Sequence, residues 1–528
     1  MPTLHWIGKE KVINHHMDVP FKVLEHSYGF DNGNQINKET RSGNKIIHGD
    51  NLEALKALLP EYEGKIKCIY IDPPYNTGNE SWVYNDNVND PKIKKWLGQV
   101  VGKEAEDLTR HDKWLCMMYP RLKLLYKLLA DDGAMFISID DNEQANLKLI
   151  CDEIFGNNNY ISSIVWRRRS SSQMAQSKVS VDHEYVVSYF KKPGLRFLGT
   201  KKDYKNYSNP DNDPRGSWTM GDLTVGMTKD QRPNQYFDLQ DPETDRTYPA
   251  SQKRVWTFSP NTMREKVLEK RVIFPKTQGG KPMMKRFLSE LKSDIDPFST
   301  WVAKDTHSVG LNSEGTKVIQ TLFGEKIFDY PKPISLLEVL FRQLLSENDT
   351  VLDSFAGSGT TAHAVFNLNK EDGGNRKFIM IEMEDYAQTI TAERVKRVIT
   401  GYADVEGTGG TFDFYELGQP MFLEDGNLNQ LVGTERIRKY VYYSETKTPL
   451  EQTKHEDCEY FLNKHNDTAY YFYYEQDGIT TLDKHFLSTI KTRAEQFVIY
   501  ADNCLLTKAH MAKHHIIFKK IPRDITRF

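Results

Sequence analysis

The sequence has few cysteines and none of the patterns in which cysteine and histidine commonly bind metals. Its five cysteines, in 528 residues, are widely spaced and include no Cys-x-x-Cys pair. This argues against both a disulfide framework and a zinc site, so we expect reduced, structural thiols. No His-Glu-x-x-His occurs, and the adjacent pairs His15-His16 and His514-His515 carry side chains that diverge in regular structure. We therefore expect no metal cofactor.

The sequence also lacks the hydrophobic segments of exported and membrane proteins. It contains no stretch of about eighteen apolar residues and no signal-peptide core near its start. We expect a cytoplasmic protein with no membrane partner. With 38% hydrophobic and 12% aromatic residues, the chain can bury large cores, and its length suggests about three domains. No nuclease or helicase motif is present.

The most informative motif is the tetrapeptide Asp72-Pro73-Pro74-Tyr75, which follows the largely apolar run Lys65–Ile71. The run predicts a buried strand, and the prolines end it because neither can donate to a sheet. Asp72 and Tyr75 would project from the strand's carboxyl end, where open α/β sheets bind ligands. The Asp72 carboxylate and the Pro73 carbonyl could accept both hydrogens of a nucleobase amino group while the Tyr75 ring stacks on the base. The alternative is a solvent-facing Asp after a Pro-Pro turn.

A second motif, Thr350–Thr361, combines an apolar strand, a glycine-rich turn and the start of a helix. Glycines let the backbone approach a ligand, and a helix N-terminus favours negative charge such as a carboxylate. The turn is not a phosphate P-loop, because the lysine and the glycine spacing are missing. It also lacks the serine of a nucleophile elbow. We interpret it as a nucleotide-cradling βα turn.

The apolar segment Lys377–Glu382 predicts the next strand, with an acid at its tip. An acidic residue in this position after a glycine-rich turn is suited to hydrogen-bond ribose hydroxyls. Glu382 is therefore a candidate ribose ligand. The alternative is that Glu382 only begins a solvated loop with Glu384 and Asp385.

Together these residues resemble the motifs of the DNA methyltransferases that modify amino groups with S-adenosylmethionine. Asp72–Tyr75 matches the catalytic motif of that family and Asp353–Thr361 its cofactor-binding glycine motif. The catalytic motif comes first by roughly 280 residues, which is the circularly permuted order of the β class. The resemblance implies an α/β, Rossmann-like methyltransferase fold in circularly permuted form, with target-recognition residues between the two motifs.

The same resemblance implies the contacts of the cofactor, S-adenosylmethionine. Ile47–Leu55 looks like the family's strand-to-helix motif, in which Asp50 would reach the adenine; read alone, Asp50 is equally suited to be the N-cap of the following helix. Asp329–Leu336 looks like the segment beside the methionine portion of the ligand. The residues expected at the cofactor are Asp50, Asp72, Lys332, Ser335, Asp353, Phe355, Gly357, Gly359, Thr360, Thr361 and Glu382.

Beyond the general family, Met1–Lys9, Asp72–Asn79 and Phe518–Ile525 resemble the modification subunits of Type III restriction-modification systems. This resemblance implies methylation of adenine in duplex DNA at its 6-amino nitrogen, and an Asp rather than a Ser at the head of the tetrapeptide favours the same base. It also implies a homodimer and, as a further partner, a restriction (helicase-nuclease) subunit. The alternatives are a cytosine 4-amino group or RNA as substrate, or a catalytically silent DNA-binding specificity subunit.

The charge distribution points to a DNA-binding insert. Residues 161–300 contain 25 Lys and Arg and 16 Asp and Glu, a net charge of +9, whereas the whole chain carries −3. A basic segment in an acidic protein is expected of a polyanion-binding insert, although each basic cluster alone would more often be a solvated face. The candidate DNA contacts are Arg167, Arg168, Arg169, Lys191, Lys192, Lys253 and Arg254, with Lys201, Lys202, Lys285 and Arg286 as further members of the basic set.

We predict the following domains. An N-terminal lead (1–40) precedes the catalytic half of the methyltransferase domain (41–160), the target-recognition insert (161–310), the cofactor-binding half (311–403) and a small C-terminal α/β domain (404–528). Strands are expected at Ala134–Ile139 and, in the C-terminal domain, near Ala469–Tyr474, Gln496–Tyr500 and His515–Lys519. The family uses its C-terminal part for subunit contacts; the aromatic run Tyr470–Tyr474 could serve these or form a core strand.

Overall fold

The computed structural model describes residues 3–77, 95, 98–99, 109–170, 179–277, 279–450 and 457–527. Parts of two motif segments, Met1-Pro2 and Gly78-Asn79, lie outside these residues. The chain forms two compact units, one built from Met1–Phe197 and Ser299–Phe528 and the other from Leu198–Phe298. None of the helices in the described ranges is long and apolar enough to cross a membrane.

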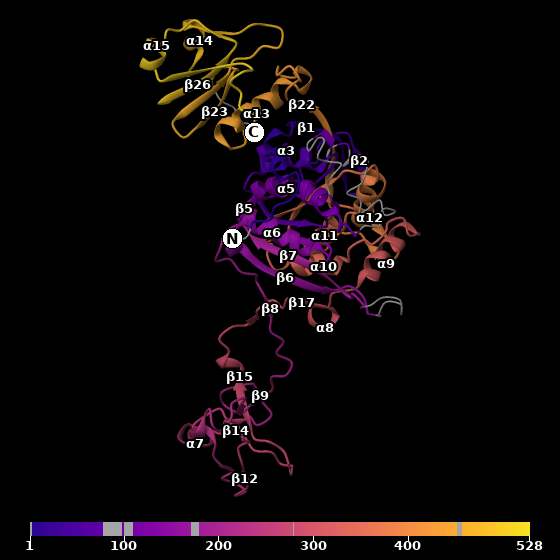
Figure 1. Ribbon diagram of the computed structural model, residues 1–528, viewed down its shortest axis with the longest axis vertical. Coiled ribbons are helices and arrows are strands. Elements are labelled where there is room, and N and C mark those ends of the chain that lie inside the picture. The colour runs from indigo at the N-terminus through magenta and orange to yellow at the C-terminus, as the bar shows by residue number, and fades with distance from the viewer. Residues whose placement is uncertain are drawn as a thin grey trace. The chain divides into compact units, whose positions relative to one another are not determined.

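An eleven-stranded sheet in the order β17-β6-β7-β5-β4-β18-β19-β3-β22-β1-β2 is the centre of the larger unit. The sheet combines strands from early and late parts of the chain, as the indigo and orange elements in Figure 1 show. The strands are β1 (Lys22–Asp31), β2 (Asn34–Ile36), β3 (Lys45–His48), β4 (Ile66–Ile71), β5 (Leu129–Ile139), β6 (Tyr160–Arg167), β7 (His183–Phe190), β17 (Trp301–Val302), β18 (Thr350–Asp353), β19 (Lys377–Glu382) and β22 (Thr411–Pro420).

The central pairing joins the two motif-bearing strands. β4 and β18 are parallel neighbours, with Val351 opposite Cys68. In the sequence, the long segment between the two motifs separates these strands. From β4 the sheet continues to β5 on one side, and from β18 it continues to β19 on the other, all in parallel. The border between β4 and β18 is therefore a topological switch point, where open α/β sheets form a ligand crevice at the carboxyl ends. The permuted order predicted from the motifs is confirmed.

Helices cover both faces of this sheet. On one face Ile69 and Ile71 of β4 belong to a large core shared with α3, α5 and α6, while Tyr70 contacts Phe341 of α10 on the other. Buried strands covered on both faces are apolar throughout, which explains why the runs at 66–71 and 377–382 were recognisable in the sequence. The helices of this unit are α1 (Lys9–Val12), α2 (His15–Asp18), α3 (Asn51–Tyr62), α5 (Arg110–Leu128), α6 (Gln144–Phe155), α8 (Lys304–His307), α9 (Asn312–Phe323), α10 (Ile334–Phe341), α11 (Thr360–Asp372), the π-helix η5 (Ala387–Ala392) and α12 (Glu393–Thr400).

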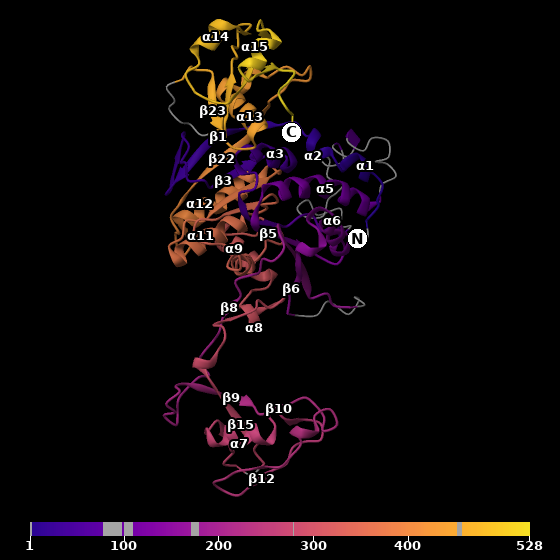
Figure 2. The same ribbon diagram turned by 90° about the vertical axis from the view of Figure 1, so that its left-hand side faces the viewer.

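The C-terminal part of the larger unit contains a four-stranded sheet in the order β23-β24-β26-β28. The three strands expected here are confirmed, and Tyr471 and Phe472 are buried in separate cores, so the aromatic run is a core strand. One core includes residues of α13 and the other residues of α14, which lie on opposite sides of the sheet (Figure 2). The elements are β20 (Gly401–Tyr402), β21 (Val405–Glu406), α13 (Thr434–Thr446), β23 (Phe461–His465), β24 (Thr468–Phe472), β25 (Thr481–Leu482), α14 (Lys484–Thr489), β26 (Gln496–Ala501), β27 (Asn503–Cys504), α15 (Lys508–Lys513) and β28 (Ile516–Lys520).

The smaller unit, Leu198–Phe298, has its own small core around Leu223, Trp256 and Met263. It is narrower than the insert predicted for 161–310, because β6, β7 and β17 pair within the central sheet. Its elements are β8 (Thr200–Lys201), β9 (Trp218–Asp222), β10 (Thr224–Val225), β11 (Leu239–Gln240), β12 (Thr247–Tyr248), β13 (Val255–Trp256), α7 (Pro260–Leu268), β14 (Val272–Ile273), β15 (Met283–Phe287) and β16 (Ile295–Asp296).

Candidate active site

Asp72 leaves β4 at the switch point, as its position after the apolar run predicts. Its Oδ2 lies 2.8 Å from Nζ of Lys332, and its Oδ1 is buried with no hydrogen-bond partner in the described part of the chain. Burial raises the pKa of Asp72 above its usual range, and the Lys332 ammonium opposes that rise. A buried acceptor without a donor is costly, so this oxygen is available for a ligand that carries an N–H group.

Tyr75 is buried beside Asp72, and its hydroxyl is bound by a residue that the sequence did not predict. Its hydroxyl donates to Oε2 of Glu184, on β7, at 3.0 Å. Lys332 Nζ lies 4.8 Å from the centre of the Tyr75 ring and 3.6 Å from Glu184, and Arg168 pairs with Glu184 at 3.1 Å. Two carboxylates and two cations thus form a charge-balanced cluster around the ring. No local pattern in the sequence indicates Glu184, because its role depends on strand pairing between distant segments.

The backbone after the tetrapeptide is fixed by buried polar contacts. The Pro74 carbonyl accepts a hydrogen bond from the Trp114 indole at 2.6 Å. Asn76 adopts a left-handed φ of 58°, and its amide donates to the carbonyl of Arg110 and to Glu143. Glu143 is fully buried. Such strained backbone persists only where its surroundings determine it, so the loop that carries Asp72 and Tyr75 is rigidly supported.

The glycine-rich turn follows β18 at the neighbouring strand tip. Asp353 accepts hydrogen bonds from the backbone N–H of Phe355 at 3.0 Å and from the Thr361 hydroxyl at 2.5 Å. Burial raises the pKa of Asp353 to about 7. Gly357 and Gly359 have φ values of 51° and 80°, in the left-handed region that favours glycine. Gly357 lines the pocket at the switch point, whereas Gly359 packs against Thr391.

Glu382, at the tip of β19, is buried and bonded to the glycine turn. Its carboxylate accepts hydrogen bonds from the backbone N–H groups of Gly357 at 2.7 Å and of Met383 at 2.8 Å. Burial raises the pKa of Glu382 to about 7. This position excludes the alternative in which Glu382 begins a solvated loop, and it ties the tips of β18 and β19 together.

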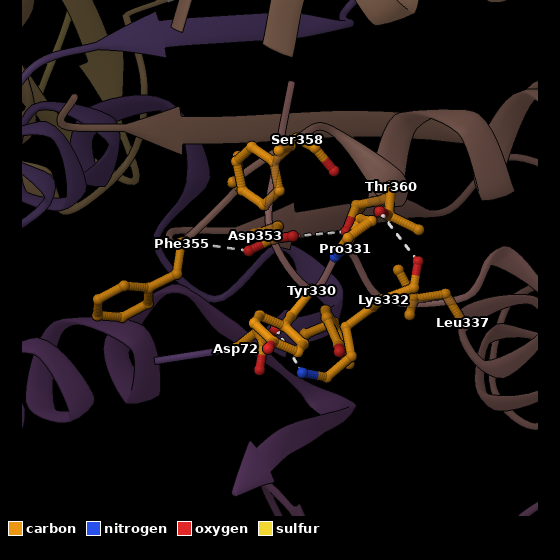
Figure 3. Close-up of a pocket in the computed structure, with 14 residues that line it drawn as sticks. Asp72, Tyr330, Pro331, Lys332, Leu337, Asp353, Phe355, Ser358 and Thr360 are labelled. Carbon is orange, nitrogen blue, oxygen red and sulfur yellow. Dashed lines mark hydrogen bonds and ion pairs between the residues drawn. The ribbon is translucent and has the colours of Figure 1, made fainter. Parts of the chain in front are cut away.

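A pocket at the switch point brings the two motifs together, as Figure 3 shows for Asp72, Lys332 and Asp353. The aromatic residues Phe328 and Tyr330 also line it. Tyr330 belongs to the predicted segment Asp329–Leu336, whereas nothing local to the sequence indicates Phe328. The predicted cofactor residues that line the pocket are Asp72, Lys332, Asp353, Phe355, Gly357, Thr360 and Thr361.

The other four predicted cofactor residues, Asp50, Ser335, Gly359 and Glu382, do not line this pocket, and Asp50 and Ser335 make structural contacts. Asp50 is the N-cap of α3 and accepts hydrogen bonds from the N–H groups of Leu52 at 2.9 Å and of Glu53 at 3.1 Å. The capping alternative for Asp50 is thus confirmed. The Ser335 hydroxyl donates to Glu314 at 2.8 Å and accepts from the Gly310 N–H at 2.9 Å. Neither residue lines the pocket.

The basic residues assigned to DNA binding are spread over different parts of the molecule. Arg167 is exposed at the end of β6, Arg168 belongs to the cluster around Glu184, and Arg169 is half-buried. β7 runs antiparallel to β5, so Lys191 and Lys192, which follow it, lie at the edge of the sheet opposite to Asp72. Lys191 donates to the Tyr126 carbonyl there, and Lys192 pairs with Asp131.

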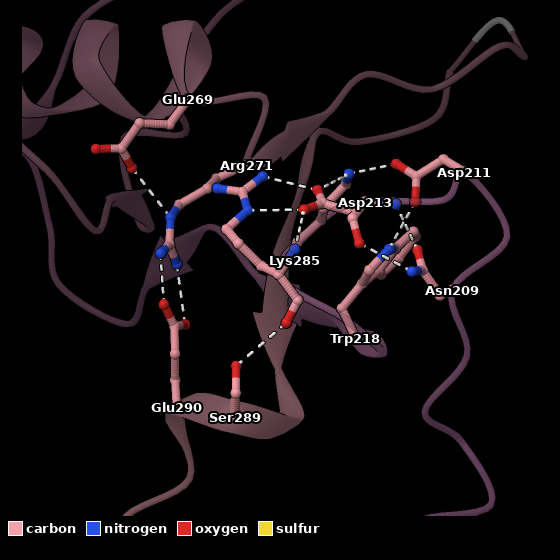
Figure 4. Close-up of polar contacts among 10 residues, drawn as sticks. Asn209, Asp211, Asp213, Trp218, Glu269, Arg271, Lys285, Ser289 and Glu290 are labelled. Atoms are coloured by element: carbon pink, nitrogen blue, oxygen red, sulfur yellow. Dashed lines mark hydrogen bonds and ion pairs between the residues drawn. The ribbon is translucent and has the colours of Figure 1, made fainter.

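Within the smaller unit, several of the basic residues form ion pairs that stabilise the fold. Lys285 is buried and pairs with Asp211 and, at 2.8 Å, with Asp213 (Figure 4). Arg254 pairs with Asp222 at 2.6 Å on the surface. Lys253 and Lys201, in contrast, are exposed. Only part of the positive charge in this segment is therefore free of carboxylate partners.

A buried acidic and glycine-rich pocket at the switch point of an open α/β sheet is typical of enzymes that bind nucleotide-like ligands. The chain matches the family model described as DNA methylase, of the N6/N4 type, over residues 66–393. It belongs to that family, and its fold is the circularly permuted α/β methyltransferase fold expected from the motifs.

Curated relatives agree with this membership. The Mod subunit of the Type III restriction-modification enzyme StyLTI from Salmonella typhimurium is 36% identical, over 66% of this chain and 54% of the relative. The EcoPI Mod subunit from Escherichia phage P1 is 31% identical, over 72% and 64%. The Type II methyltransferase M.KpnI from Klebsiella pneumoniae is 31% identical, over 68% and 85%. The chain thus spans between half and two thirds of the length of the Mod subunits that it resembles.

Proposed function

We propose that this protein transfers a methyl group from S-adenosylmethionine to the 6-amino nitrogen of adenine in duplex DNA, as the modification subunit of a Type III restriction-modification system. The observation that carries the proposal is the pocket in which Asp72, from the tetrapeptide, and Asp353, from the glycine turn, lie at adjacent strand tips. Similarity to two Type III Mod subunits supports the choice of system.

The residues of the pocket fit S-adenosylmethionine. This ligand carries two positive groups, a sulfonium and an ammonium, together with a carboxylate and a nucleoside. The buried carboxylates of Asp72 and Asp353 suit the positive groups. The N-terminus of α11, where Gly359 provides no side-chain cap, suits the carboxylate. We assign the ribose hydroxyls to Glu382, and the bound cofactor would supply an electrophilic methyl group.

The chain's own residues would prepare the amino group. The free Oδ1 of Asp72 and the Pro73 carbonyl accept its two hydrogens, so that its lone pair turns away from the ring towards the methyl group. The Lys332 ammonium favours the ionised form of Asp72 against the effect of burial, and an ionised carboxylate only accepts hydrogen bonds. Tyr75 stacks on the base after it leaves the helix. Proximity of the two reactants supplies much of the rate.

We assign DNA binding to the smaller unit together with Arg167, whose exposed side chain lies near the carboxyl edge of the sheet. The exposed Lys201 and Lys253 would contact phosphates, which provide affinity without sequence information. A homodimer and a restriction subunit are the proposed protein partners, the latter because two relatives are named as Mod subunits of restriction-modification enzymes.

Modification-sensitive sequencing of DNA from a methylation-free host, after incubation with the purified protein and S-adenosylmethionine, tests this proposal. We expect 6-methyladenine at one short motif, and no methylation with Asp72→Ala at unchanged thermal stability. Methylation of cytosine at N4 would instead show that cytosine is the target base. DNA binding without any modified base would favour a silent specificity subunit.

A further inference from the structure

Glu184 stands out among the buried carboxylates because it makes three polar contacts at the proposed target-base site. It is the second residue of β7 and is 5% exposed. Its Oε2 accepts a hydrogen bond from the Tyr75 hydroxyl at 3.0 Å and lies 3.6 Å from the Lys332 ammonium. Its Oε1 pairs with Arg168 at 3.1 Å. A carboxylate buried to this degree is costly unless it is paired on both oxygens, and both are.

These contacts determine how Tyr75 presents its ring. A tyrosine side chain has two rotatable bonds before the ring, and a hydrogen bond at the hydroxyl fixes the direction of the ring axis, on which the hydroxyl oxygen lies. Lys332 constrains the rotation of the ring about this axis, since its ammonium lies 4.8 Å from the ring centre while it also pairs with Asp72 at 2.8 Å. The Tyr75 ring, which is the proposed stacking surface, and the Asp72 carboxylate, which is the proposed acceptor, thus both contact the Lys332 ammonium. A preorganised surface loses less entropy when the base arrives than a mobile one does.

We propose that Glu184 is a positioning residue for the target base: it holds the Tyr75 ring by its hydroxyl and shares the Lys332 ammonium with Asp72. This inference rests on the proposed function, because it gives Tyr75 the role of stacking on a nucleobase amine substrate. Glu184 does not touch the reacting atoms itself. Its effect on catalysis passes through Tyr75 and Lys332, and its removal is expected to alter transfer without altering cofactor affinity.

A double-mutant cycle with Glu184→Ala and Tyr75→Phe tests the linkage, with single-turnover methyl transfer to duplex DNA as the readout. We expect Glu184→Ala to slow transfer at least about tenfold in the wild-type background and less than about threefold when Tyr75 is already Phe. A residue that acts only on overall folding would slow transfer by the same factor in both backgrounds. Equal factors would therefore overturn the proposal.

Tyr75→Phe alone provides a second test if Glu184→Ala does not fold. The ring remains, and Glu184 keeps Arg168 and Lys332, so this variant removes the hydroxyl that donates to Glu184 and also stabilises the ionised form of Asp72. We expect it to slow transfer about tenfold, while the Kd for S-adenosylmethionine changes less than twofold. Unchanged transfer by Tyr75→Phe would overturn the anchoring role.

Glu153→Ala is the matched control. Glu153 also accepts a hydrogen bond from a tyrosine, Tyr119, at 2.9 Å and pairs with a lysine, Lys9, at 2.7 Å, but it lies on α6 and does not line the pocket. We expect its loss to lower the melting temperature without changing the rate of transfer. An inactive wild-type protein would contradict the proposed function itself. If the wild type is active and the losses caused by Glu184→Ala and Tyr75→Phe multiply in the double variant, only the role of Glu184 is contradicted.

Discussion

The Lys332 ammonium lies 2.8 Å from the Asp72 carboxylate, and the carbonyl of the same lysine accepts a hydrogen bond from the Thr360 hydroxyl at 3.4 Å. Lys332 therefore contacts both halves of the site: its side chain reaches the catalytic tetrapeptide and its backbone reaches the first residue of α11. The cation also offsets the tendency of burial to protonate Asp72. Lys332 thus connects the glycine-rich turn, through its backbone, with the charge of Asp72, through its side chain.

Lys332→Met should slow methyl transfer, and more strongly at low pH. Because the ammonium lowers the pKa of Asp72, its removal lets burial raise that pKa further, so the carboxylate is protonated over a wider range. Activity of the variant, relative to wild type, should be lower at pH 6.5 than at pH 8.5. Lys9→Met is the control, since Lys9 forms a similarly buried pair with Glu153 away from the pocket. A variant-to-wild-type ratio that is the same at every pH would contradict this role.

Cofactor binding should weaken as the pH falls through about 7. Burial raises the pKa of Asp353 and of Glu382 to about 7. In the proposed site the ionised form of Asp353 attracts a positive group of S-adenosylmethionine, and the ionised form of Glu382 accepts hydrogen bonds from the ribose hydroxyls. The same shift has a cost for folding: an acid whose folded pKa exceeds its unfolded value, about 4, destabilises the fold progressively as the pH rises from about 4 to about 7.

The increase in melting temperature that S-adenosylmethionine produces should consequently be larger at pH 8 than at pH 6. Asp353→Asn removes one of the two titrating groups and should flatten this dependence. Differential scanning fluorimetry across the pH range, with and without ligand, measures both effects. A ligand-induced shift that grows towards acid pH would show that neutral carboxyl groups bind the cofactor.

Gly359→Ala should reduce cofactor affinity at least about tenfold. The residue has a φ of 80°, and an added Cβ would lie 3.1 Å from the carbonyl oxygen of Thr391, so the turn must shift. Gly373→Ala is a closely matched control at the other end of α11, with a φ of 74° and no atom within 4 Å of the added Cβ. Both substitutions carry the left-handed strain of about 1–2 kcal/mol. Only Gly359→Ala should change the Kd for S-adenosylmethionine, measured by calorimetry.

The sequence predicted the parts of the site that depend on local chain geometry. The strand Lys377–Glu382 is predicted with its observed bounds, and the strand predicted at Lys65–Ile71 begins one residue later, at Ile66. Both were predictable because buried parallel strands are largely apolar. Asp353 and Thr361 are eight positions apart and interact across one turn. Such contacts follow from the motif itself.

Contacts between distant segments were not predictable in this way. Glu184 reaches Tyr75 only because β7 pairs antiparallel with β5, and nothing in a single sequence specifies that register. Likewise Lys191 and Lys192 look like DNA contacts by charge, yet the direction of β7 places them at the opposite edge from Asp72. The predicted insert begins at residue 161 because the net charge becomes positive there and the regular strand and helix pattern weakens. In the structure, strand pairing keeps β6 and β7 in the central sheet.

The two kinds of lysine in the smaller unit should respond differently to substitution. Lys253→Ala removes an exposed charge and should weaken DNA binding about equally for all sequences, lowering the slope of log affinity against log salt by about 1. Lys285→Ala should instead destabilise the unit, because it removes the buried cation that pairs with Asp211 and Asp213, although Asp213 keeps its pair with Arg215. Salt titrations of DNA affinity and urea unfolding separate these effects. A Lys285→Ala protein with normal stability and a reduced salt slope would show that the buried pair opens to bind phosphate.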